Sequence, residues 1–122
     1  MKSVIAVFLG GGIGSVARFL LSAAMQRTFP GLFPYGTFAV NILGSLLLGI
    51  LIGLSSRSLP TPEWRMLLAV GFCGGFTTFS TFSLETAELL RGAHYTAALV
   101  YTGASVVVGL GAVCAGLWIA RT

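Results

Sequence analysis

Residues 71–83 hold the side chains best suited to binding chemistry in this sequence. They read Gly-Phe-Cys-Gly-Gly-Phe-Thr-Thr-Phe-Ser-Thr-Phe-Ser, with five hydroxyl groups and no charged side chain. Hydroxyl groups donate hydrogen bonds, and the edge of a phenyl ring carries a positive partial charge. Such a set favours a small, strongly hydrogen-bonding anion without any fixed positive charge. The alternative interpretation is a phenylalanine stripe in a helical core.

The composition around this run is that of a membrane protein. Of 122 residues, 56% are hydrophobic and 8% are charged, whereas soluble domains have about 25% charged residues. Uncharged stretches occupy 3–17, 28–56, 66–84 and 92–120, and a membrane-spanning helix needs roughly 20 apolar residues. A soluble globule of this size and a disordered chain are both excluded. The seven basic residues are scattered singly, so a nucleic-acid partner is not expected.

The apolar pattern predicts an all-α fold with four transmembrane helices in a single domain, residues 1–122. The expected helices cover 3–26, 35–54, 62–91 and 95–120, so both termini lie on one side of the membrane. Basic residues on that side are Lys2, Arg57, Arg65 and Arg121, against Arg27, Arg91 and Arg18 on the other. The difference in the number of basic residues between the two sides decides the orientation of a membrane protein. This difference is small here, which leads to the hypothesis that the protein inserts in both orientations.

The third predicted helix is expected to break near residues 74–78. Gly74 and Gly75 disfavour helix, and the hydroxyl groups of Thr77 and Thr78 can bond to local backbone instead. Unwound backbone in a membrane is tolerated where it is buried in protein or lines a wet cavity. It commonly supplies carbonyl groups for a cation and amide groups for an anion. The alternative is a kinked helix whose hydroxyl groups bond to its own carbonyls.

Other polar residues lie within the predicted spans. Asn41 can donate two hydrogen bonds, and its spacing suits a functional site and a bond between helices equally well. Arg18 can snorkel outward or line an aqueous vestibule. Tyr101 and Ser105 of the fourth helix can reach the phenylalanine-bearing face through their hydroxyl groups. Small residues four apart favour close helix packing, and a homodimer is the natural way for four short helices to enclose a pathway.

Other classes of protein fit the sequence less well. It has one histidine, His94, and no aspartate, and Cys73 and Cys114 lie in apolar runs, so we expect no enzyme. A proton-coupled small multidrug transporter also has four short helices, but it needs a carboxylate in the first helix, which contains none. A structural protein without transport would leave the polar residues of the third helix unexplained.

Three segments, 11–19, 35–44 and 71–82, resemble the bacterial CrcB/Fluc fluoride channel family. The likeness covers the whole chain, and the Gly-Gly-Phe-Thr-Thr-Phe-Ser-Thr-Phe run at 74–82 is its most specific motif. The resemblance implies an antiparallel, dual-topology homodimer with two narrow pores in the bacterial inner membrane. It also implies passive efflux of fluoride from the cytoplasm, and so resistance to fluoride.

The resemblance further implies roles for residues at matching motif positions. Phe79 and Phe82 would be paired rings facing the ion, Asn41 would donate hydrogen bonds along the pore, and Arg18 would lie at the vestibule. The remaining pore residues would be Ser80, Thr81, Ser83, Tyr101, which supports a ring, and Ser105. Backbone carbonyls at Gly74 and Thr77 would bind a structural Na⁺ shared by both subunits.

Overall fold

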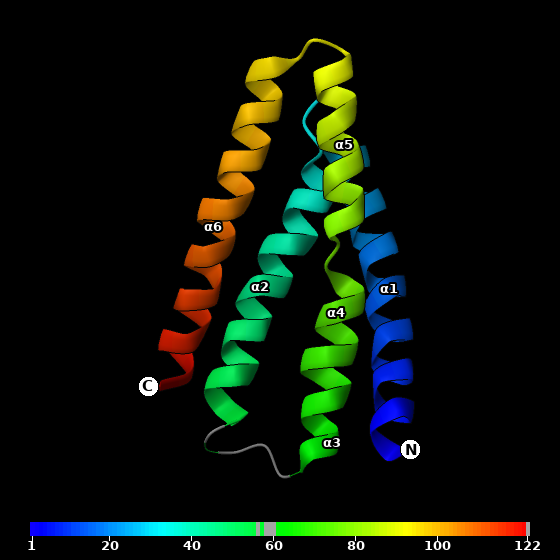
Figure 1. Cartoon of the computed structure of the whole chain (residues 1–122), viewed down its shortest axis with the longest axis vertical. Coiled ribbons are helices and arrows are strands. Elements are labelled where there is room, and N and C mark those ends of the chain that lie inside the picture. Colours follow the sequence, from blue (N-terminus) through cyan, green and yellow to red (C-terminus); the bar gives the residue numbers. More distant parts are fainter. Residues whose placement is uncertain (56, 58–60, 122) are drawn as a thin grey trace.

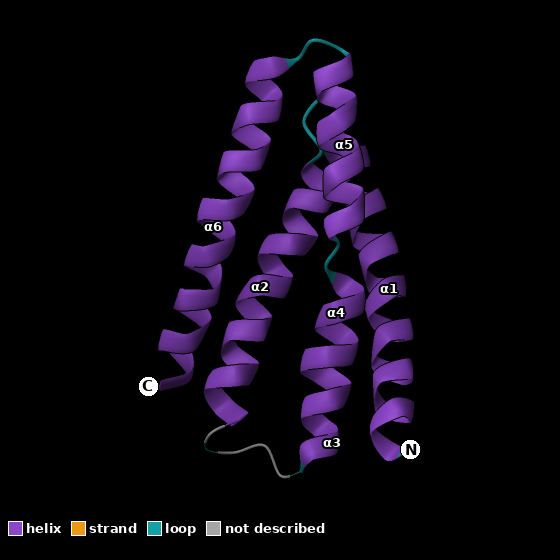
Figure 2. Ribbon diagram, in the orientation of Figure 1, coloured by secondary structure: helices purple, strands orange, loops and turns teal. Residues whose placement is uncertain are grey.

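The computed structural model describes residues 1–55, 57 and 61–121, and this part of the chain is entirely helical apart from its connections (Figures 1 and 2). The elements are α1 (Lys2–Thr28), α2 (Tyr35–Ser55), α3 (Pro62–Arg65), a π-helix η1 (Met66–Cys73), α4 (Gly74–Phe76), α5 (Phe79–Arg91) and α6 (Tyr95–Arg121). Elements α3, η1, α4 and α5 together form the third span. Four segments are long and apolar enough to cross a membrane, as the sequence predicts.

Three of the four spans are one to three residues longer than predicted, and the third has the predicted bounds. The hydroxyl group of Thr28 donates to the Ala24 carbonyl at 2.9 Å and extends the last turn of α1. Pro30 and Pro34 follow, and proline cannot continue the hydrogen-bond ladder of a helix. Residues 56 and 58–60 of the predicted second connection lie outside the described part of the chain. The N-terminus and the end of α6 lie at the same end of the bundle (Figure 1).

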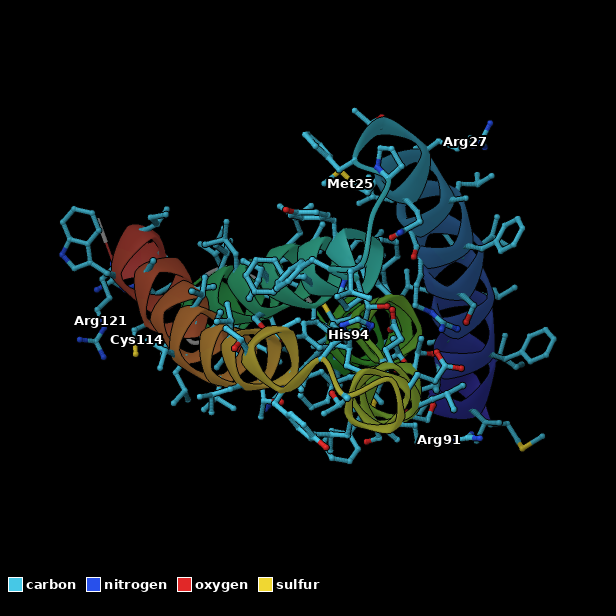
Figure 3. All side chains as sticks on the ribbon, turned by 90° about the horizontal axis from the view of Figure 1, so that it is seen from above. Met25, Arg27, Arg91, His94, Cys114 and Arg121 are labelled. Atoms are coloured by element: carbon cyan, nitrogen blue, oxygen red, sulfur yellow. The ribbon has the colours of Figure 1, made fainter. Side chains whose placement is uncertain are left out.

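Two pairs of elements form the main helix contacts, α2 with α6 and α1 with η1. Seen from above, α1 and α6 lie at opposite sides of the molecule, with α2 and the third span between them (Figure 3). Glycine allows the close approach in both pairs. A Cβ added at Gly49 would collide with the Val113 carbonyl of α6, and one added at Gly10 would collide with the Leu67 carbonyl of η1. Such backbone contact is typical of helices in lipid.

The third span is interrupted between α4 and α5 (Figure 2). Thr77 and Thr78 are extended, with φ and ψ of −93° and 158° and of −149° and 124°, before α5 begins at Phe79. These two residues fall inside the range 74–78. The π-helix before them is not anticipated by the sequence pattern. Such wide turns occur mostly as short insertions near functional sites, which draws attention to the interruption that follows.

A small apolar core fixes the end of the bundle beyond the interruption. Leu89 of α5 and Ala98 and Tyr101 of α6 are buried together, and Phe82 is among the partly buried residues that pack against them. Most other large apolar side chains of α1 and α6 are exposed in the isolated chain, as helices that face lipid require. The core therefore holds α5 against α6 while leaving the interrupted segment to be held by polar contacts.

Candidate functional site

The helix before the interruption ends in a closed turn. The Thr77 amide donates to the Cys73 carbonyl at 3.0 Å, and its hydroxyl group donates to the same carbonyl at 2.8 Å. Arg18 of α1 donates from Nε to the Gly75 carbonyl at 3.0 Å. A helix end leaves up to four carbonyl groups without helical partners. The Cys73 carbonyl keeps its helical partner, the Thr77 amide, and Arg18 satisfies the Gly75 carbonyl from another helix. Arg18 therefore points into the protein at this level.

Asn41 of α2 binds both polar groups of the Thr78 backbone. Its Nδ2 donates to the Thr78 carbonyl at 3.0 Å, and its Oδ1 accepts from the Thr78 amide at 2.8 Å. In an uninterrupted helix the Thr78 amide would donate to the Gly74 carbonyl, four residues earlier. Asn41 takes that donor and leaves the Gly74 carbonyl without its helical partner. The side chain thus joins helices, and Nδ2 keeps a second N–H for another acceptor.

A first cavity of about 410 Å³ opens beside the interruption. Residues with predicted roles that line it are Asn41, Gly74, Thr77, Phe79, Phe82 and Ser105, and none of its described lining residues is charged. The Phe79 side chain is 78% exposed. The Ser105 Oγ is buried and has no hydrogen-bond partner in the described chain. The cavity therefore combines rings with polar groups that have unused hydrogen-bonding capacity.

The two phenylalanine rings differ in how firmly they are held. The centroids of Phe79 and Phe82 are 5.9 Å apart, and their planes are inclined at 42°. The Phe82 ring also packs on Tyr101, with centroids 5.0 Å apart and planes at 54°. Tyr101 is fully buried, so it gives Phe82 a fixed support, whereas Phe79 has little covering it.

A second cavity of about 410 Å³ lies between α1, α2 and the start of α5. Arg18, Thr78, Thr81 and Glu85 are among its lining residues, and Thr78 lines both cavities. Thr78 caps α5: its hydroxyl oxygen accepts from the Thr81 amide at 3.2 Å and donates to the Thr81 hydroxyl at 3.1 Å. Because Thr81 accepts in that bond, its own hydroxyl proton can point to another acceptor.

Glu85 is a candidate residue that the sequence analysis leaves unassigned. Its Oε1 accepts from the Thr37 hydroxyl at 2.5 Å and from the Tyr101 hydroxyl at 3.5 Å. It therefore connects α2, α5 and α6 at the second cavity. An ionisable residue inside a membrane span is a candidate functional residue by default. That rule applies to Glu85 and Glu88 alike, and the contacts with two other helices distinguish Glu85.

The structure separates the remaining predicted residues from these cavities. Ser80 and Ser83 are exposed and are not among the lining residues of either cavity. The Ser80 hydroxyl lies 3.5 Å from that of Thr78. In the isolated chain the hydroxyl groups thus do not form one continuous row. Among the described residues, no three His, Cys, Asp or Glu side chains are grouped to hold a metal ion.

Comparison with known proteins identifies the family. Residues 5–117 match the family described as CrcB-like protein, Camphor Resistance (CrcB). The chain belongs to the CrcB-like protein family. A relative from Phocaeicola vulgatus is 48% identical over 121 residues, covering 99% of this chain and all of that protein. Relatives from Leptospira interrogans and Bacteroides fragilis are 46% and 50% identical, covering 98% and 95% of this chain and 95% and 94% of theirs. All three relatives are named fluoride-specific ion channel FluC.

Proposed function

We propose that this protein is a fluoride-selective ion channel that gives passive efflux of fluoride from the cytoplasm and so confers fluoride resistance. It is an ion channel and not an enzyme. One observation carries the proposal: α5 begins inside the third span, beside a cavity whose described lining has hydrogen-bond donors and phenyl rings but no charge. The names of relatives that match this chain over nearly its whole length support it.

The start of α5 supplies the main attraction for an anion. The first amides of a helix lack helical acceptors and carry the positive end of the helix dipole. Asn41 and Ser105 add neutral donors beside them, and the edges of the Phe79 and Phe82 rings add positive partial charge. Fluoride accepts short hydrogen bonds and is small enough for these groups to surround. A larger halide accepts weaker bonds and would have to separate the rings.

Arg18 and Thr81 form the approach to this site from the second cavity. Arg18 and the acidic Glu85 both line that cavity. The positive charge of Arg18 lies beside the interruption, and there it raises the local concentration of anions. Its bond to the Gly75 carbonyl fixes its place beside the interruption. The free proton of Thr81 and the exposed hydroxyls of Ser80 and Ser83 extend the series of donors. We assign these hydroxyl groups to the pore in the assembled channel.

The active form in this proposal is an antiparallel homodimer in the bacterial inner membrane. The 78% exposure of Phe79 supports it, because a ring at an ion path needs a second surface to exclude lipid. Ser105 supports it as well, since its buried hydroxyl has no partner in the described part of one chain. The excess of basic residues at the end that holds the termini is small, and such a weak bias permits insertion in both orientations. A second, inverted copy would close the first cavity and complete each pore.

A structural Na⁺ is the expected cofactor, and the interruption has a group that fits it. Asn41 withdraws the Thr78 amide from Gly74, so the Gly74 carbonyl is available as a ligand at the negative end of the helix formed by α3, η1 and α4. Oxygen atoms at such broken helix ends commonly coordinate Na⁺. Gly74 and Thr77 both line the first cavity, where a second subunit would add its own carbonyls. The ion would join the subunits through backbone oxygen alone.

Ion efflux from liposomes tests the proposed function. Purified protein is reconstituted into liposomes loaded with potassium fluoride or potassium chloride, and valinomycin is added to dissipate the membrane potential. Ion-selective electrodes should report rapid fluoride release and chloride release at the rate of protein-free liposomes. Equal release of both anions would refute selectivity, and fluoride release at the protein-free rate would refute the channel.

Two further experiments address the assembly and the cation. A two-copy fusion should conduct only when its linker lets the second copy invert, so full activity of a forced parallel pair would contradict the antiparallel arrangement. Replacing Na⁺ throughout purification with N-methylglucamine should reduce fluoride efflux and dimer stability together. Unchanged values for both would exclude a structural Na⁺.

A further inference from the structure

An apolar groove at the N-terminal end of the bundle has one basic and one acidic residue among those that line it. It has a volume of about 340 Å³ and is lined by Lys2, Ile5, Ala6 and Leu9 of α1, Glu63 and Trp64 of α3, and Leu67 of η1. This volume lies within the range of about 300–1,000 Å³ typical of small-molecule sites. The groove shares no lining residue with the two cavities of the proposed ion path. It therefore needs an explanation of its own.

The position of the groove in the membrane can be deduced from its residues. The first and third spans begin at Lys2 and Pro62, so the mouth of the groove lies at the level of the lipid headgroups. Trp64 is 47% exposed there, and tryptophan is enriched at this interface. From Lys2 to Leu9 the α1 wall rises about 10 Å toward the bilayer centre, at ~1.5 Å per residue. Lys2 and Glu63 therefore lie at the headgroup end of the groove and Leu9 lies deeper, in the order that a phospholipid would require.

The two charges at the mouth indicate which headgroup fits. Lys2 and Glu63 line the same groove, and neither forms an ion pair with any described residue, although their charges are opposite. A phosphate accepts hydrogen bonds from a lysine ammonium, and a carboxylate accepts them from a primary ammonium. A headgroup with only negative charge would be repelled by Glu63, and a quaternary ammonium has no N–H to donate.

We propose that this groove is a binding site for phosphatidylethanolamine. The lipid phosphate binds Lys2, its primary ammonium binds Glu63, and the first part of an acyl chain lies between Ile5, Leu9 and Leu67. Trp64 borders the chain at the depth of the glycerol backbone. The site is distinct from the proposed ion path, because it shares no lining residue with the first and second cavities.

Lipid binding to the purified full-length protein tests this proposal. Native mass spectrometry would compare phosphatidylethanolamine, phosphatidylcholine and phosphatidylglycerol with identical dioleoyl chains. The wild-type protein should bind phosphatidylethanolamine about tenfold more tightly than the other two, a difference of about 1.4 kcal/mol. Equal binding of the three lipids would overturn the proposal.

Three variants locate the site if the preference is found. Glu63→Gln should abolish the preference over phosphatidylcholine, and Ala6→Phe should fill the groove and remove phosphatidylethanolamine binding while circular dichroism still reports a helical protein. Glu88→Gln is the matched control, since Glu88 lies on α5, outside the groove, and should leave the preference intact. A preference that survives Glu63→Gln, or binding that survives Ala6→Phe, would refute this assignment whatever the result of the fluoride assay.

Discussion

Replacing Asn41 by alanine removes both hydrogen bonds between its side chain and the Thr78 backbone. The Thr78 amide and carbonyl would each lose their partner in the middle of a membrane span. Hydrogen bonds between transmembrane helices average about 0.6 and reach about 1.7 kcal/mol, and a buried polar group left unsatisfied costs about 1–3 kcal/mol. With about 1–1.5 kcal/mol for each of the two bonds, Asn41→Ala should lower the free energy of unfolding by about 2–3 kcal/mol.

Reversible unfolding in mixed micelles measures this change as a shift of roughly 30- to 150-fold in the unfolding equilibrium. Thr86→Ala is the matched control, because the Thr86 hydroxyl donates only to the Phe82 carbonyl of its own helix, and its loss should cost little. Fluoride efflux from Asn41→Ala liposomes should also fall, since the start of α5 would no longer be fixed. An unfolding free energy within about 0.5 kcal/mol of wild type would refute the reasoning.

Three other variants separate packing from conduction. Gly10→Ala should destabilise the protein by about 1–3 kcal/mol, because the new Cβ would collide with the backbone of η1. The control Gly12→Ala should have little effect in the same unfolding assay, because no atom lies within 4 Å of the new Cβ. Phe79→Ile should cut fluoride efflux severalfold at unchanged stability, and the lipid-exposed control Phe8→Ile should not; equal efflux from both would assign Phe79 to packing. Ser105→Ala removes an oxygen that lacks a hydrogen-bond partner in the described chain. The free energy of unfolding should therefore stay the same or rise by about 1 kcal/mol, while fluoride efflux falls. Unchanged efflux would exclude Ser105 from the ion path.

The number and type of spans can be read from the sequence because uncharged length and hydropathy decide whether a helix crosses a bilayer. The two glycines and two threonines at 74–78 locate the segment where Thr77 and Thr78 are extended. The π-helix at Met66–Cys73 could not be foreseen. It packs closely against Gly10 and Gly14 of α1, and no local pattern encodes that contact.

The candidate site was only partly accessible to sequence reasoning. The spacing of Asn41 suits a functional site and a bond between helices equally well. Only the fold reveals that its side-chain amide binds the backbone of Thr78. The sequence gives Glu85 no assignable role, because its bonds to Thr37 and Tyr101 come from two other helices. Long-range contacts of this kind depend on helix rotation, which apolar periodicity does not specify when helices are hydrophobic on all sides.

The hydrogen bonds of the interrupted segment also bear on the order of biosynthesis. Arg18 and Asn41, which satisfy the Gly75 carbonyl and the Thr78 peptide groups, both precede residues 74–78 in the chain and leave the ribosome first. When the irregular stretch enters the bilayer, its partners can therefore already be present. A circular permutant that starts at the third span would deliver that stretch without them, and it should insert poorly even though its mature contacts would be the same.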